Sequence, residues 1–152
     1  MNTRLTRYLK ALLILATTTF DVNAENRQAF AAATITFVKQ QLEINVEIAS
    51  SREQRELGLM HRTSLGKNHG MLFAYPDQEP RRVWMKNTLL PLDVLFLAND
   101  GRIVAMLDNL QPCASDPCPI YNSQVDAMYM LELNAGFIKN HNVEVDQTLQ
   151  LP

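Results

Sequence analysis

The chain has 152 residues, which suits one domain and leaves little room for two. Hydrophobic residues make up 47% and charged residues 20%, a globular composition that excludes an intrinsically disordered chain. The formal net charge is -2 and there is no long basic run, so nothing predicts binding to nucleic acid.

The first 24 residues have the pattern of a secretory signal peptide. Basic side chains up to Lys10 precede an apolar stretch over residues 11–20, and small or modest side chains follow at 22–24. A bilayer span needs about 20 apolar residues, so this stretch is too short to cross a membrane. The pattern predicts an exported protein, periplasmic or secreted, with no stable membrane insertion after cleavage. An uncleaved amphipathic anchor is the alternative.

The mature chain is expected to start with a flexible leader over residues 25–33, followed by a single β-rich domain over residues 34–152. Residues 42–49 alternate between apolar and polar side chains, which predicts a half-buried strand, with 34–38 as its hairpin partner. Ser50 and Glu53 form a capping-box pattern that predicts a short helix over 52–60.

Short strands are expected along the rest of the chain. The predicted strands cover residues 71–75, 82–87, 94–98, 102–109, 127–134 and 143–152, with a turn at 76–80 and a hairpin turn at 99–101. Asn134 is expected to cap a second short helix over 135–141. Six to eight short strands with two short helices predict a mainly β (α+β) fold, a small closed or barrel-like mixed sheet.

The two cysteines, Cys113 and Cys118, lie in a proline-rich loop. In an oxidising compartment two nearby thiols usually pair, so the sequence predicts a structural disulfide. A catalytic dithiol is the alternative, although redox pairs favour two intervening residues and there are four here. No metal site is predicted, because there is no second cysteine pair and the histidines are scattered.

The most apolar run of the chain, residues 83–97, contains four polar side chains that require an explanation: Lys86, Asn87, Thr88 and Asp93. The period of a strand places Trp84 and Lys86 on one face. In a structural interpretation, Asp93 forms an ion pair with Lys86, while Asn87 and Thr88 satisfy the backbone of the bend before Pro91.

A functional interpretation places a pocket beside the same bend. Trp84 would form its wall, with Lys86, Asn87, Thr88 and Asp93 as polar contacts to a small molecule or an envelope partner. Stacking on an aromatic ring together with hydrogen bonds suits a sugar ring or a cell-wall fragment. No cofactor is expected.

An enzyme is the less favoured alternative. A cell-envelope hydrolase using Asp93 as acid or base would need a second carboxylate at about 5–9.5 Å, with Asp108, Asp126 and Glu132 as candidates. His61 could act as an acid or base, whereas Ser123 lies in no nucleophile motif. A purely structural or interaction module is the third alternative, and it would expose a large apolar patch.

Six methionines lie in or near the apolar segments: Met60, Met71, Met85, Met106, Met128 and Met130. Thioethers can bind copper(I). Because most of these residues lie in apolar strands, filling of the core is the favoured interpretation.

Four segments resemble a widespread prokaryotic family, the domain of unknown function 192: "REQRELGLMHRTSLGKNHGMLFAY", "WMKNTLLPLDVLFLANDGRI", "PCPIYNS" and "YMLELNAGF". The resemblance runs from about Leu42 to the C-terminus. It implies a compact, β-rich and often exported domain, and no established activity. The stretch "VEVDQTL" departs from the Gly-Asp turn common before the last strand of the family.

Overall fold

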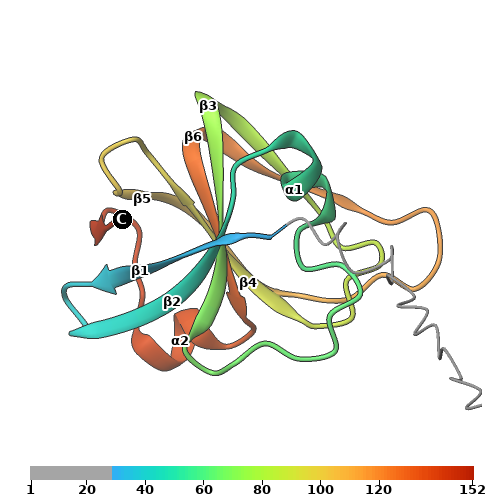
Figure 1. The fold of residues 1–152 in the computed structure, drawn as a ribbon, viewed down its shortest axis with the longest axis horizontal. Coiled ribbons are helices and arrows are strands. Elements are labelled where there is room, and N and C mark those ends of the chain that lie inside the picture. Colours follow the sequence, from blue (N-terminus) through green and yellow to red (C-terminus); the bar gives the residue numbers. More distant parts are fainter. Residues whose placement is uncertain (1–28) are drawn as a thin grey trace, which may run out of the picture.

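The computed structural model describes residues 29–152, which form one curled, seven-stranded mixed sheet with two short helices (Figure 1). The elements are β1 (Ala31–Phe37), β2 (Leu42–Ala49), α1 (Arg52–Leu57), β3 (His69–Trp84), β4 (Leu92–Leu97), β5 (Ile103–Leu110), β6 (Ile120–Asn134), α2 (Phe137–His141) and β7 (Leu149–Gln150). This half-barrel confirms the predicted fold class. The predicted signal peptide lies outside the described residues.

The strand order is β5-β4-β6-β3-β2-β1-β7. Only β2 and β3 pair in parallel, and the segment that contains α1 makes the crossover between them. The two ends of the curled sheet approach each other near β7. The N–H of Ile103 donates to the carbonyl of Gln147 at 2.8 Å, and the N–H of Leu149 donates to Gly101 at 3.0 Å. These bonds protect the backbone at the edge strands.

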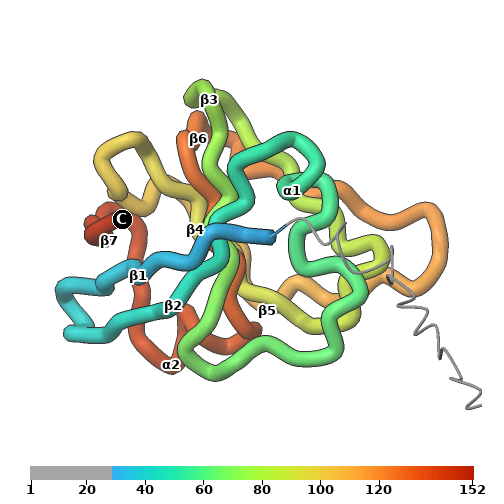
Figure 2. Tube along the Cα trace, viewed as in Figure 1, coloured from blue at the N-terminus to red at the C-terminus, as the bar shows by residue number. Residues whose placement is uncertain are grey.

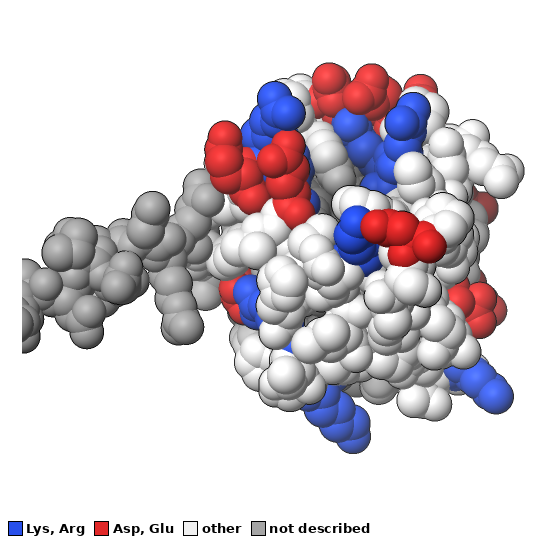
Figure 3. Space-filling model, turned by 90° about the vertical axis from the view of Figure 1, so that its right-hand side faces the viewer, with Lys and Arg blue, Asp and Glu red and all other residues white. Residues whose placement is uncertain are grey.

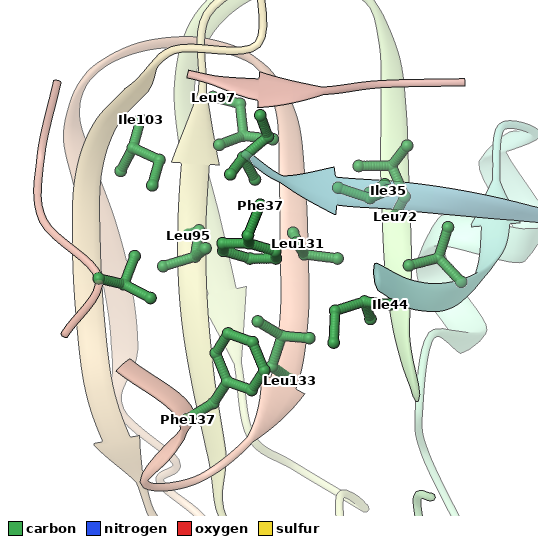
Figure 4. Close-up of a cluster of buried hydrophobic side chains, with 13 residues drawn as sticks. Ile35, Phe37, Ile44, Leu72, Leu95, Leu97, Ile103, Leu131, Leu133 and Phe137 are labelled. Carbon is green, nitrogen blue, oxygen red and sulfur yellow. The ribbon is translucent and has the colours of Figure 1, made fainter. Parts of the chain in front are cut away.

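Hydrophobic side chains fill both faces of the sheet. One cluster lies inside the curl and includes Phe37, Leu95, Leu131 and Phe137 (Figure 4). The other cluster contains Met71, Phe73, Val94, Phe96 and Met130. Neighbours along a strand alternate between the clusters, because successive side chains point to opposite faces. All six residues of β4 are therefore buried, as its unbroken apolar run predicted.

Several strand predictions had wrong boundaries. The segments 71–75 and 82–87 form one long strand, β3, since residues 76–80 continue it through register shifts instead of making a turn. Strand β6 begins seven residues earlier than predicted, because it pairs with this long β3. The final strand shrinks to β7, after a left-handed residue at Asp146 (φ 71°). Strand β1 begins at Ala31, within the expected leader.

Both helix caps also differ from the prediction. Ser51, not Ser50, caps α1, and it forms a capping box with Gln54. The helix ends at Leu57, because Gly58 adopts φ 47°. Gly136 precedes α2 without a side-chain cap. The Asn134 amide instead donates to the carbonyl of Gly66 at 2.9 Å, so it ties β6 to the loop before β3.

Neither helix within residues 29–152 is long and apolar enough to cross a membrane.

Candidate functional site

A cavity of about 410 Å³ lies between α1 and the face of β3 and β6 that carries the second hydrophobic cluster. The apolar part of its wall consists of Leu57, Leu59, Met60, Phe73, Val83 and Met130. Its polar and aromatic lining consists of Arg55, Glu56, Tyr75, Arg82, Trp84, Thr88 and Glu132. Its volume falls in the usual range of small-ligand sites. We refer to it as the Glu132 cavity.

Glu132 is the unusual residue of this cavity. It lies opposite Met71 of β3 and Val94 of β4, in the interior of the sheet, and is only 7% exposed. Among residues 29–152, its carboxyl group makes no hydrogen bond and no ion pair. Burial raises the pKa of Glu132 to about 8, because the charged form is poorly solvated there. At neutral pH the group is mostly a protonated acid that faces the cavity.

Tyr75 lies between the buried acid and the α1 side of the cavity. Burial is the main reason that the pKa of Tyr75 is raised; Arg81 lowers it, Glu132 raises it further and Arg55 lowers it. The Arg55 guanidinium lies 5.1 Å from the Tyr75 ring and donates to the backbone carbonyl of Ala74 at 3.0 Å. Arg55 is thus used to hold α1 against β3.

Arg82 differs from the other basic side chains near the cavity. It is exposed, and within the described part of the chain its guanidinium makes no hydrogen bond and no ion pair. Its neighbour Arg81 is 5% exposed and is held by Ala127 at 2.8 Å and by Glu79 at 3.1 Å. Arg82 is therefore the guanidinium at this cavity that is available to a ligand.

Trp84 lies at the cavity with 45% of its surface exposed. The Lys86 ammonium is 5.2 Å from the Trp84 ring, so the two side chains share a face as predicted. The predicted ion pair of Lys86 with Asp93 is wrong. Lys86 pairs with Asp116 at 2.6 Å, because the loop that carries Asp116 folds back over the end of β3.

That loop is closed by the predicted disulfide between Cys113 and Cys118. The N–H of Cys113 donates to the carbonyl of Met85 at 3.2 Å. The backbones of Lys86 and Cys113 form an isolated parallel β-bridge at this point. Figure 2 shows the disulfide loop beside the segment that follows β3, on the right of the view. The loop therefore supports the strand end that carries Trp84.

Asn87 and Thr88 have different surroundings. Asn87 is exposed and adopts φ 57°, and its carbonyl accepts the N–H of His61 at 2.8 Å. This backbone bond ties the bend to the turn after α1, whereas the side chain of Asn87 makes only a 4.0 Å contact with the Met60 sulfur and does not bond the backbone of the bend as expected. Thr88 is 6% exposed and lines the Glu132 cavity beside Trp84.

Asp93 is fully buried and lies away from the cavity. One of its oxygens accepts the N–H of Asn109 and the other the N–H of Ile138, each at 2.8 Å. It pairs in register with Leu133, while Glu132 pairs with the next residue, Val94, so Asp93 and Glu132 lie on opposite faces of the sheet. The structure does not bring together the carboxylate pair that a hydrolase based on Asp93 and Glu132 would need.

The other candidate groups lie outside any cluster. Asp108 and Asp126 are exposed, while Ser123 is buried and accepts the N–H of Arg81 at 2.9 Å. Within residues 29–152 no group of three His, Cys, Asp or Glu side chains is placed to hold a metal ion. Met71, Met85 and Met130 are buried in the second hydrophobic cluster, where they fill the core.

Charge is mixed on the side of the molecule that faces the reader in Figure 3, which is the right-hand side of Figure 1. Lysine, arginine and acidic side chains gather together in the upper part of this face, and much of its lower part is uncharged (Figure 3). No patch of a single sign dominates this view.

Comparison of the sequence with models of known families identifies the family of this chain. A model of the DUF192 family, described as an uncharacterized ACR, matches residues 34–151. The chain belongs to the DUF192 family. This confirms the resemblance seen in the sequence. No curated protein gave a significant match.

Two solved structures are similar to this DUF192 chain. One is a protein from Sinorhizobium meliloti 1021, described as a "putative transcription regulator"; it has 38% sequence identity and a TM-score of 0.74, over 80% of this chain and 95% of that one. The other is a protein of unknown function from Novosphingobium aromaticivorans, with 24% identity and a TM-score of 0.71, over 80% of this chain and 85% of that one. The second likeness shows the fold alone.

Sequence reasoning about this DUF192 chain underrated Glu132, which it considered only as a partner for Asp93. A signal was present: Glu132 is the single charged residue in the apolar run of β6, flanked by Leu131 and Leu133. A strand embedded in the middle of a sheet buries both of its faces, and a lone carboxyl group there needs an explanation.

Proposed function

We propose that this DUF192 protein binds a small organic molecule in the Glu132 cavity, and that it does so outside the cytoplasm. The observation that carries the proposal is a carboxyl group that is 7% exposed, lines a cavity and has no hydrogen-bond partner among the described residues.

The carboxyl oxygens of Glu132 are reachable from the cavity, because no fully buried side-chain oxygen or nitrogen among the described residues lacks a hydrogen bond. Partial burial of an unpartnered polar group still opposes folding. Moving such a group from water into an apolar environment costs about 1–3 kcal/mol in protein mutational data. Glu132 stabilises nothing visible in the fold, since its neighbours Met71 and Val94 are apolar. A ligand that hydrogen-bonds to the carboxyl group would supply the missing partner. Unfavourable groups of this kind concentrate at binding and catalytic sites.

The rest of the cavity suits a ligand with an apolar body. Phe73, Leu59 and Met130 provide apolar wall, while Trp84 offers an aromatic surface at the exposed side. Thr88 adds a hydroxyl group near Trp84. An apolar pocket with a few placed polar groups is the usual composition of a small-ligand site.

Two features support a location outside the cytoplasm. The Cys113–Cys118 disulfide is of a kind that persists in oxidising compartments and is rare in the cytosol. The pattern of residues 1–24 predicts a signal peptide, and those residues lie outside the described part of the chain. Ligands of the cell envelope, including sugars and cell-wall fragments, are accordingly the first compounds to try.

The test uses Trp84, which is the single tryptophan of the sequence, as a fluorescent reporter. The purified protein is titrated with sugars, amino acids, short peptides and muropeptides while its emission is followed, and thermal unfolding is measured in parallel. A ligand at about 100 times its Kd stabilises the protein by about 2.7 kcal/mol. We expect a shift in both signals.

Glu132→Gln keeps the shape of the side chain but can neither donate a hydrogen bond from a carboxyl hydroxyl group nor become a carboxylate, so it should weaken binding at least tenfold. Glu43→Gln is the matched control, because Glu43 is an exposed carboxylate of β2. It should leave binding unchanged. The proposal fails if no compound shifts either signal, or if the ligand that does so binds Glu132→Gln and the parent equally.

A further inference from the structure

We infer that the ligand of the Glu132 cavity is dipolar: a primary ammonium group binds Glu132, an apolar body fills the cavity, and a carboxylate binds Arg82. An apolar amino acid or a short peptide has this chemistry. The inference rests on the proposed binding function and names the class of ligand.

One acidic and one basic side chain at this cavity lack partners. Glu132 and Arg82 both line it, and neither side chain makes a hydrogen bond or an ion pair within residues 29–152. The other two charged side chains of the wall are already engaged. Arg55 donates to the carbonyl of Ala74 at 3.0 Å, and Glu56 accepts from Arg52 at 2.8 Å. One acidic and one basic group therefore remain for a ligand.

Glu132 and Arg82 line the same cavity, yet the guanidinium of Arg82 does not offset the burial of the carboxyl group. Burial alone perturbs the carboxyl group of Glu132, and neither Arg82 nor Arg55 offsets it. An arginine within about 4–6 Å of a carboxylate would favour its charged form. Arg82 and Glu132 therefore do not neutralise each other across the cavity, and each can bind a different group of the same ligand.

Part of the cavity wall is apolar and suits the apolar body of such a ligand. Leu59, Phe73 and Met130 line the cavity and offer no hydrogen-bonding side chain. If a ligand rich in hydroxyl groups bound there, many of its hydroxyl groups would lack hydrogen-bond partners. An apolar side chain would be buried without that cost. Aromatic rings such as that of Phe73 also tolerate a nearby ammonium group through their negative faces.

A second cavity lies on the other part of β3. Its volume is about 500 Å³, and its lining shares Tyr75 and Arg82 with the Glu132 cavity. Arg82 therefore lines both cavities, which leaves room near it for a ligand longer than a single residue. The short ligand is the minimal case and the simplest to test.

Three small probes separate the two charges. L-Phenylalanine has both the ammonium and the carboxylate, phenethylamine has only the ammonium, and 3-phenylpropionate has only the carboxylate. Titration at about pH 8 against Trp84 emission, checked by calorimetry, should rank L-phenylalanine first, phenethylamine second and 3-phenylpropionate last, with about tenfold between successive probes.

Two variants assign the ends. Glu132→Gln should weaken phenethylamine at least tenfold and leave 3-phenylpropionate within twofold. Arg82→Gln should remove the advantage of L-phenylalanine over phenethylamine, whereas Lys67→Gln, which removes an exposed cation elsewhere, should not. Thermal unfolding of each variant without probe confirms that it is folded.

The outcomes separate the two proposals. The inference is overturned if 3-phenylpropionate binds the parent protein as tightly as phenethylamine does. It is also overturned if the Glu132→Gln variant binds both probes with the same affinity as the parent protein. If a neutral sugar requires Glu132 while none of the three probes binds, the cavity is a binding site and the dipolar ligand is wrong. If neither the probes nor the wider panel binds, both proposals fail.

Discussion

The carboxylate of Asp93 in β4 accepts the backbone N–H of Ile138 in α2, with an oxygen–nitrogen distance of 2.8 Å, although the two residues are 45 positions apart in the chain. Its second oxygen accepts the N–H of Asn109, which adopts φ 52° in β5. One buried side chain therefore joins a helix and an irregular strand to the centre of the sheet, and it satisfies two backbone donors, those of the exposed Asn109 and the half-buried Ile138.

Asp93→Ala should destabilise the protein by about 2–4 kcal/mol, because it leaves two backbone N–H groups without acceptors. Chemical denaturation monitored by Trp84 fluorescence measures the change. Asp108→Ala is the control, since Asp108 is exposed in β5, and it should shift stability by less than about 0.5 kcal/mol. The folded Asp93→Ala variant should bind the ligand as tightly as the parent protein does. Loss of binding in a variant that is still folded would show that Asp93 contributes to the binding site.

Glu132 should make stability depend on pH. Its pKa is about 8 in the folded protein against a usual value of 4.5, so the folded state holds the proton more tightly than the unfolded state. Its contribution is fully present below about pH 4.5 and is lost as the pH rises through about 8. The free energy of unfolding should fall by about 1.4 kcal/mol per pH unit in that window.

The comparison with Glu132→Gln isolates this effect from the other titrating groups. The charged groups that line the same cavity are Arg55 and Glu56 on α1 and Arg82 on β3, with Tyr75 also titratable. All of them remain in the variant, so only the Glu132 contribution should disappear. Parallel pH profiles for the parent and the variant would show that the carboxyl group is not buried in solution.

Reducing the Cys113–Cys118 disulfide should lower the free energy of unfolding by about 2 kcal/mol, because the cross-link of this short loop reduces the conformational entropy of the unfolded chain. It should also free Asp116 from Lys86 and change the Trp84 emission, since Lys86 lies 5.2 Å from that ring. Thermal unfolding with and without a reductant measures the first effect. The Cys113→Ser/Cys118→Ser variant should have the same unfolding temperature as the reduced parent, with or without reductant. If the reductant also lowers the unfolding temperature of this variant, the effect does not come from the disulfide.

Gly58→Ala should destabilise the protein by about 1–3 kcal/mol. Gly58 adopts φ 47°, and an added Cβ would lie 3.1 Å from the Phe73 ring. The same methyl group would narrow the Glu132 cavity, so ligand affinity should fall as well. Thermal unfolding and Trp84 titration give the two readouts. A variant as stable as the parent would mean that the turn after α1 relaxes without strain.

Local properties of this chain could be read from its sequence. The alternation in β2 and the unbroken apolar run of β4 identified both strands, because the direction of a side chain in a strand depends only on its neighbours along the chain. The cysteine spacing predicted the disulfide for a similar reason, since the two thiols are five positions apart. The shared face of Trp84 and Lys86 was equally local.

The partners of the polar residues were decided only by the tertiary structure. Lys86 pairs with Asp116, 30 positions away, and not with the nearer Asp93. The register of β4 against β6 sends Asp93 and Glu132 to opposite faces. Such pairings depend on how strands distant in sequence meet, and no local pattern encodes a register. The sequence alone identified most of the strands, both short helices and the disulfide, whereas their boundaries and caps depended on tertiary contacts. Packing of α1 against β3 and β6 created the cavity that makes Glu132 the candidate binding group.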